Sequence, residues 1–246
     1  MWKLLYQLAS PNYFYTTSRR YIPYLSFAAF LCLFVGIVWG LVFAPPDYQQ
    51  GDAFRIIYIH VPAAFLSVII YADMGFLAIL LLVWRLKMAG LMLVICAEVG
   101  GAMALLALIT GSLWGKPMWG AWWVWDARLT SELILLFIYG AIIATSLAYP
   151  NKESGDKIVA ILTLVGLFDL PIIHYSVIWW NTLHQGSTVF TMDAQKIHAS
   201  MSYPLFITLT GLSLYCLVVV LIKSCDALLL RERRQSWVKN LITGTV

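Results

Sequence analysis

The sequence predicts an all-α polytopic membrane protein that crosses the bilayer with six helices. Of its 246 residues, 61% are hydrophobic and only 11% are charged, whereas soluble domains average about 45–50% apolar and about 25% charged residues. So little polar surface cannot cover a water-soluble globule, which excludes a soluble enzyme, a disordered regulator and a secreted disulfide scaffold. Six long apolar runs and an uneven distribution of Lys and Arg support the same fold class.

Each spanning helix is predicted from one apolar run. A helix needs about 20 mostly apolar residues to cross a bilayer, and six runs are this long: residues 22–44, 57–84, 89–113, 129–149, 157–180 and 203–223. The second and fifth runs contain Pro62 and Pro171, and each proline removes a backbone donor and can kink its helix. Because the connections are short and no repeat is found, residues 1–246 are predicted to form one helical bundle.

The positions of Lys and Arg orient this bundle. Of the 16 basic residues, only Arg55, Lys116, Arg128 and Lys196 fall on one side, and the remaining twelve fall on the other. Basic residues collect on the cytoplasmic side, so both termini are predicted to be cytoplasmic and the loops 45–56, 114–128 and 181–202 to face outward. The aromatic segment 1–18 either lies along the inner surface as an interfacial helix or simply anchors the first span.

All four histidines fall on the predicted outer side. His60 lies near the start of the second helix, His174 in the outer third of the fifth, His184 just after that helix and His198 just before the sixth. A single histidine at a membrane interface is usually a hydrogen-bonded anchor. Four on one face favour metal or cofactor ligation instead, because imidazole is the commonest protein metal ligand and also holds haem iron.

The third connection, residues 114–128, concentrates tryptophan beyond what an aromatic belt requires. It contains Trp114, Trp119, Trp122, Trp123 and Trp125. Gly115, Pro117 and Gly120 argue against a regular helix through residues 114–120. A short helix over 119–128 would place three of the tryptophans and Asp126 on one face. We therefore expect an apolar shelf that binds a ligand, with a re-entrant anchor packed on the bundle as the structural alternative.

Haem matches these features together. Its macrocycle is flat and apolar, its iron accepts axial imidazoles, and its propionates would pair with the outer cations Arg55, Lys116 or Arg128. For Asp126 and Glu132, a structural role is the alternative to a contact with haem. Either acid would hold Arg128 or cap the start of the fourth helix, where negative charge is favoured.

Three acidic residues, Asp73, Glu98 and Asp169, lie near the middle of predicted spans. A carboxylate inside the membrane is a functional-site hypothesis by default, although a buried carboxyl group can also stay neutral and form local hydrogen bonds. No basic partner is expected at the same depth, which argues against a proton or substrate path. The four cysteines are far apart in the sequence and are predicted to be free thiols.

Several segments carry a resemblance to a known family. The loop that ends in residues 123–128 (WVWDAR) resembles the WWD domain of the haem-handling proteins of cytochrome c biogenesis. The match narrows with residues 43–51 (FAPPDYQQG), 55–62 (RIIYIHVP), 170–176 (LPIIHYS) and 179–186 (WWNTLHQG). Together they resemble the cytochrome c maturation protein C (haem exporter protein C) family across all six helices. The longer WWD relatives have more spans than 246 residues can supply.

This resemblance implies both a site and partners. His60 and His184 would be the axial ligands of a non-covalently held haem b, and the WWD segment would be its platform. With Arg55, the implied haem-binding residues are Trp114, Trp119, Trp122, Trp123, Trp125, Asp126 and Arg128. The protein would sit in the bacterial inner membrane, present haem at the periplasmic face and deliver it to the haem chaperone CcmE. Its complex would include the ATP-binding subunit CcmA, the membrane subunit CcmB and the small subunit CcmD.

The resulting hypothesis is a docking and hand-over device rather than an enzyme, and the chain has no P-loop motif of its own. One rival is a b-type haem or quinone-reactive membrane oxidoreductase, which would place paired histidines inside helices, where only His174 clearly lies. A second is a permease that moves haem through its own bundle, which the three acids inside the spans keep open. A purely structural subunit would explain neither the clustered tryptophans nor the outer histidines.

Overall fold

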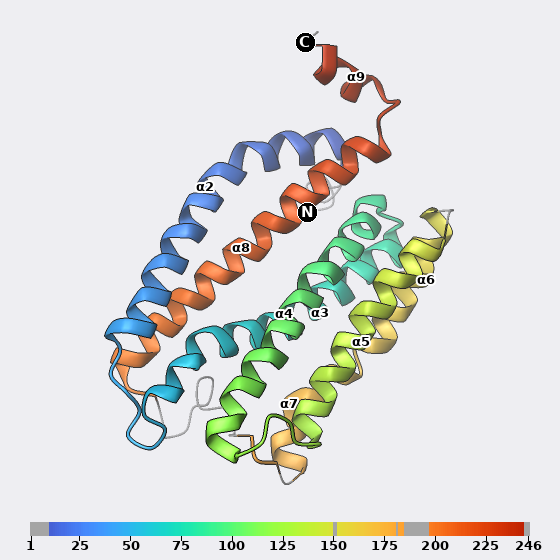
Figure 1. Cartoon of the computed structure of the whole chain (residues 1–246). Coiled ribbons are helices and arrows are strands. Elements are labelled where there is room, and N and C mark those ends of the chain that lie inside the picture. Colours follow the sequence, from blue (N-terminus) through green and yellow to red (C-terminus); the bar gives the residue numbers. More distant parts are fainter. Residues whose placement is uncertain (1–9, 150–151, 181, 185–196, 244–246) are drawn as a thin grey trace.

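The computed structural model describes residues 10–149, 152–180, 182–184 and 197–243, and its regular structure there is helical (Figure 1). The helices are α2 (Pro11–Val38), α3 (Ile57–Trp84), α4 (Lys87–Trp119), α5 (Ala127–Ala148), α6 (Lys152–Gly166), α7 (Asp169–Trp179), α8 (Ala199–Arg231) and α9 (Ser236–Thr243). A π-helical turn (Trp39–Phe43) extends α2, and a 3-10 turn (Asp52–Ile56) precedes α3. Within the described residues, six helical segments are long and apolar enough to cross a membrane, which confirms the predicted fold class.

The first and last spans are longer than the apolar runs predicted. The first helix begins at Pro11 rather than at residue 22, and Figure 1 shows it bent, with Pro23 inside it. Residues 11–18 are therefore continuous with the first spanning helix; residues 1–9 of that predicted segment lie outside the described residues. At the other end, α8 continues beyond residue 223 to Arg231. A helix is held by backbone hydrogen bonds, which polar residues also form. Both helices therefore continue past the end of the apolar run.

The prediction that no regular helix runs through residues 114–120 is wrong, because α4 continues to Trp119. Gly115 does not break the helix: it is buried, and a Cβ there would lie 3.0 Å from the ring of Trp119. Pro117 falls in the last turn, so the helix ends soon after the bond that proline removes. Gly120 ends α4 in a left-handed conformation with φ 76°, which glycine adopts without steric cost.

The fifth predicted span is one apolar segment but two helices. Between α6 and α7 the backbone changes to hydrogen bonds between residues three apart, as in a 3-10 turn. Phe168 N donates to Val165 O at 3.3 Å, and Leu170 N donates to Leu167 O at 3.2 Å. Pro171 follows in the first turn of α7, where a missing N–H leaves no acceptor unpaired. The proline therefore begins a new helix instead of kinking a continuous one, and Asp169 is the first residue of α7.

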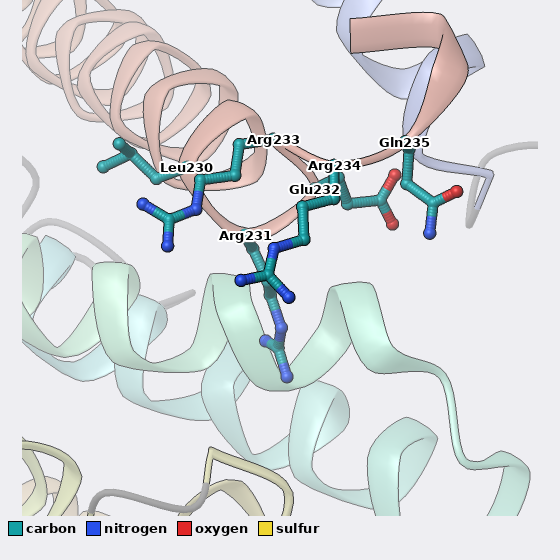
Figure 2. Close-up of a pocket in the computed structure, with 6 residues that line it drawn as sticks. All are labelled: Leu230, Arg231, Glu232, Arg233, Arg234 and Gln235. Carbon is teal, nitrogen blue, oxygen red and sulfur yellow. The ribbon is translucent and has the colours of Figure 1, made fainter. Parts of the chain in front are cut away.

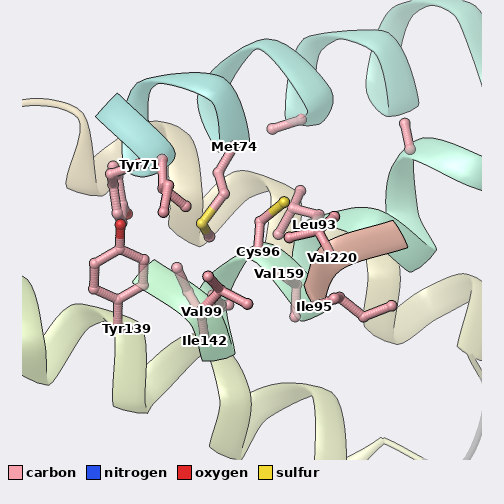
Figure 3. Close-up of a cluster of buried hydrophobic side chains, with 14 of the residues drawn as sticks. Tyr71, Met74, Leu93, Ile95, Cys96, Val99, Tyr139, Ile142, Val159 and Val220 are labelled. Carbon is pink, nitrogen blue, oxygen red and sulfur yellow. The ribbon is translucent and has the colours of Figure 1, made fainter. Parts of the chain in front are cut away.

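The core lies between α3, α4, α5 and α6, with α8 closing one side (Figure 3). Tyr71 and Tyr139 meet edge to face there, with ring centroids 5.1 Å apart. Glycines make room for both rings, because a Cβ on Gly166 would lie 2.0 Å from the Tyr71 hydroxyl and one on Gly100 2.3 Å from the Tyr139 hydroxyl. Such small-to-large packing is how membrane helices approach closely. All four cysteines are free, as predicted.

Two ion pairs join helices distant in sequence. Lys223 on α8 pairs with Glu98 on α4, so the prediction that no basic partner reaches the depth of Glu98 is wrong. The apolar run was taken to end at residue 223, whereas α8 runs on and its packing brings Lys223 to α4. Arg231 Nη2 lies 2.9 Å from Asp156 Oδ2 and connects α8 to α6. Figure 2 shows Arg231 among the residues that line a surface cavity of about 460 Å³ at this end of α8.

Candidate functional site

Two of the four histidines meet at the end of the bundle opposite α9 (Figure 1). His60 lies in the first turn of α3, and His184 follows α7 at the edge of the described residues. Their ring centroids are 6.4 Å apart and the ring planes are tilted by 42°. Residues 124 positions apart in sequence are therefore neighbours. His174 instead packs edge-on against Tyr175, and His198 caps the start of α8.

The His60 ring is held by α4. Its Nδ1 lies 3.1 Å from the carbonyl oxygen of Ala107 and 3.1 Å from the hydroxyl of Thr110. A carbonyl can only accept, so Nδ1 is the nitrogen that carries the proton in the neutral ring and Nε2 keeps its lone pair. Gly111 leaves space for this ring, since a Cβ there would lie 3.0 Å from His60 Cε1. The ring therefore presents an unprotonated Nε2, the kind of atom through which a neutral imidazole can bind a metal.

Two tryptophans near the end of α4 form the walls of the histidine pair. The Trp114 ring meets the His60 ring edge-on at 5.7 Å and Phe54 at 5.9 Å, and its Nε1 donates to Gln50 Oε1 at 2.9 Å. The Trp119 ring lies 6.4 Å from the His184 ring. Both tryptophans reach the site because α4 stays helical to residue 119.

The other three tryptophans of the segment point elsewhere. Residues 121–126 are not helical, so the predicted single shelf on a helix over 119–128 is wrong. Trp123 and Trp125 pack edge to face at 5.4 Å and line an open apolar groove of about 400 Å³ between α4 and α5. Trp122 is exposed, with Lys116 Nζ 5.9 Å from its ring centroid. The left-handed Gly120 ends the helix before these side chains can share a face.

The three expected propionate partners each bind a backbone carbonyl. Arg55 donates to Gly40 O at 3.2 Å and Leu41 O at 3.0 Å, in the π-helical turn after α2. Arg128 donates to Ile173 O on α7 at 2.5 Å, and Lys116 to Gly120 O at 3.0 Å. A guanidinium has five N–H donors, so these bonds position the two arginines without using all of their donors.

Asp126 connects the start of α5 to His184. Its Oδ1 accepts from Leu129 N at 2.8 Å, the N-cap role that was one of its predicted alternatives. Its Oδ2 accepts from the Thr182 hydroxyl at 2.5 Å, and the same hydroxyl accepts from His184 N at 2.9 Å. Thr182 was not among the predicted site residues. A threonine two residues before a candidate ligand carries no sequence signal unless the fold brings a carboxylate to it.

The spacing of the two rings suits a single ion between them. Metal–imidazole bonds of about 2 Å put the centres of two opposed rings roughly 6 Å apart. Among the described residues, no group of three or more His, Cys, Asp or Glu side chains converges to hold an ion. Two imidazoles with aromatic walls match the kind of side chains that hold haem iron in proteins.

Comparisons with known proteins point in the same direction. The family described as Heme exporter protein C matches residues 4–239. The chain is 49% identical over 242 residues to "Heme exporter protein C" of Escherichia coli strain K12, covering 98% of each chain. It is 43% identical over 241 residues to the protein of that name from Haemophilus influenzae, again over 98% of each. It is also 40% identical over 230 residues to the protein of that name from Bradyrhizobium diazoefficiens, and the match covers 94% of this chain and 87% of that protein.

Proposed function

The chain belongs to the heme exporter protein C family, and we propose that it serves that family's haem handling in cytochrome c biogenesis by holding haem b non-covalently between His60 and His184. The observation that carries the proposal is the histidine pair. The two ring centroids are 6.4 Å apart, and the hydrogen bond at His60 Nδ1 leaves Nε2 as the nitrogen with the lone pair. His60 and His184 would hold the iron, and two imidazole ligands would keep oxygen from it until the haem is passed on.

Around the iron, the proposed haem contacts divide between two groups of side chains. Trp114 and Trp119, next to the histidines, would cover the macrocycle, while Arg55 and Arg128 would donate to the propionates. Trp122, Trp123 and Trp125 remain in the proposed haem-binding segment but face other directions. They would therefore meet only the haem edge or an incoming partner. Asp126 would act by positioning His184 through Thr182.

The cellular role follows from the predicted orientation of this multi-pass membrane protein. With the histidine end at the periplasmic face of the inner membrane, the partly exposed haem would be accessible to the chaperone CcmE. ATP hydrolysis would belong to CcmA, and CcmB and CcmD would complete the membrane complex. The part assigned to this chain is binding and hand-over, without bond chemistry of its own.

Absorption spectra test the axial ligation. We expect the protein, purified in mild detergent with its partners, to show a six-coordinate haem whose signal is reduced or changed in His60→Ala and in His184→Ala. His174→Ala is the matched control, because that histidine is exposed and packs on Tyr175 outside the pair. Wild-type haem content and spectrum in both ligand variants would disprove the proposal.

A further inference from the structure

A buried polar network lies beneath the histidine pair. Ser67 on α3 donates to Glu132 Oε1 on α5 at 2.7 Å, and the Tyr139 hydroxyl donates to Ser67 O at 2.6 Å. The Tyr71 hydroxyl donates to Thr163 O at 3.1 Å, near the end of α6. Ser67 and Tyr139 are fully buried and Glu132 is 7% exposed. The function proposed above uses none of these groups.

A second carboxyl group faces this network from the break between α6 and α7. Asp169 begins α7 and is 7% exposed, and its buried Oδ2 has no hydrogen-bond partner among the residues that the structure describes. A discontinuous spanning helix with a buried acid at the break is a recurrent site for binding ions or protons. An unpaired carboxylate oxygen in such a place is costly, whereas a protonated carboxyl group there is not.

The register of α5 against α7 places the two carboxyl groups at one level. Arg128 on α5 donates to Ile173 O on α7. The two helices run antiparallel. Glu132 lies four residues after Arg128, and Asp169 lies four residues before Ile173. Both are therefore about one helical turn, or about 5.4 Å, deeper in the bundle than the Arg128–Ile173 bond, and they lie at the same level. The two carboxyl groups are close enough to interact electrostatically, and Arg128 interacts both with Glu132 below and with His60 above.

Charge balance then determines the protonation of the pair. If both carboxyl groups were ionised, two buried negative charges would face one guanidinium. Two neighbouring buried carboxyl groups cannot both ionise without a large free-energy penalty. One carboxylate paired with Arg128 and one carboxylic acid make the group neutral. If a haem propionate takes Arg128, the remaining carboxylate loses its counter-ion and becomes neutral only by taking a proton from solution.

We propose that Glu132 and Asp169 form an intramembrane proton-binding site, and that haem binding, through Arg128, drives the uptake of one proton by this pair. The inference rests on the haem site proposed above. The other titratable groups that interact with the pair are Arg128 and Tyr139 on α5 and Tyr71 on α3. Asp73 and Cys96 interact with Tyr139 rather than with the pair, and Asp126 and His60 interact with Arg128. Among these only Arg128 is a cation, so the charge balance depends on it.

Haem affinity measured against pH tests the linkage. Uptake of one proton on binding makes haem bind up to tenfold more tightly for each unit by which pH falls. The titration should run from about pH 9 to about pH 7, above the ordinary histidine pKa of about 6.5, so that protonation of the iron ligands does not compete. We expect this slope in the wild-type protein and in Asp73→Asn, whose carboxyl is exposed on the same helix as Ser67.

The double variant Glu132→Gln, Asp169→Asn should bind haem with an affinity that does not depend on pH, because neither side chain can take a proton. A flat wild-type profile, or a full slope in the double variant, would overturn the proposal. If wild-type protein binds no haem at all, the haem site itself fails, and the carboxyl pair is judged by the haem-free measurement alone.

Infrared spectra of the haem-free protein provide that measurement and do not need the double variant to fold. Wild type should show carboxylic-acid C=O absorption near neutral pH, and part of it should vanish in Glu132→Gln and in Asp169→Asn. In each single variant the remaining carboxylate pairs with Arg128 and stays ionised. An unchanged carboxylic-acid band in both single variants would contradict a proton held by this pair.

Discussion

At the scale of single residues, the site depends on groups that orient the two histidines. The Ala107 carbonyl and Thr110 orient His60 from α4, while Asp126 and Thr182 act on the backbone of His184. Groups that orient metal ligands typically change metal affinity by about 10–100-fold when removed. The proposed ligand pair was singled out among the four histidines only through a family resemblance, and nothing in the sequence pointed to Thr182.

Replacing Thr182 with Val keeps the shape of the side chain but removes both hydrogen bonds of its hydroxyl. We expect haem affinity to fall by about tenfold, at the low end of the range for such positioning groups, with the folded state retained. Haem titration in detergent measures this. Thr210→Val on α8 is the control, since its hydroxyl donates to the carbonyl of Phe206 on its own helix, away from the histidine pair. Equal affinities in the two variants would contradict the role given to Thr182.

Gly111→Ala tests the position of the His60 ring. The added Cβ would lie 3.0 Å from His60 Cε1, so the ring must move away from its hydrogen bonds on α4. We expect reduced haem content and an altered spectrum in purified protein. Gly140→Ala is matched to it, because nothing lies within 4 Å of a Cβ at that helical position. The expectation fails if Gly111→Ala and Gly140→Ala both resemble the wild type.

At the scale of elements, helix ends and helix contacts decide what each side chain meets. Helix α4 carries Trp114 and Trp119 to the histidines only because it continues through Gly115 and Pro117, and the same segment then turns Trp123 toward a groove on α5. Local rules for Gly and Pro predicted a break before residue 120. The structure instead keeps α4 helical to Trp119, with Gly115 buried beside the Trp119 ring.

The contact between α2 and α8 is so close that one added carbon would meet the backbone of the other helix. A Cβ on Gly211 would lie 2.7 Å from the backbone nitrogen of Leu33, so Gly211→Ala must separate the two helices, which Figure 1 shows side by side. Overpacking of this kind costs about 1–3 kcal/mol. Thermal unfolding in detergent should show a lower midpoint for this variant. A midpoint equal to that of Gly140→Ala would mean that the close contact does not contribute to stability.

At the scale of the whole molecule, the distribution of charge predicts which end of the bundle faces which compartment. The histidine site and Lys116 lie at one end, while Arg231, Arg233 and Arg234 lie at the end of α8, near α9 (Figure 1). The excess of basic residues at the second end predicts that it is cytoplasmic. Haem presentation to a periplasmic chaperone requires this orientation.

Cysteine labelling in intact cells checks the orientation. In a background without native cysteines, Lys116→Cys should react with a membrane-impermeant maleimide added outside, once the outer membrane is permeabilised. Arg233→Cys should react only after the inner membrane is opened. The reverse pattern would place the histidine site in the cytoplasm and would rule out the proposed delivery of haem.

The sequence by itself determined the fold class and the number of spans, because apolar length acts locally along the chain. Its basic-residue counts predict the outer position of the histidines. Only the tertiary structure decided that His60 meets His184, that the tryptophans separate into two groups and that Lys223 reaches Glu98. It also brought Asp169 close enough to Glu132 for the two carboxyl groups to interact electrostatically. These outcomes depend on the rotation and axial register of packed helices. That register is set by side chains far apart in sequence, such as Gly211 against Leu33 and Gly100 against Tyr139.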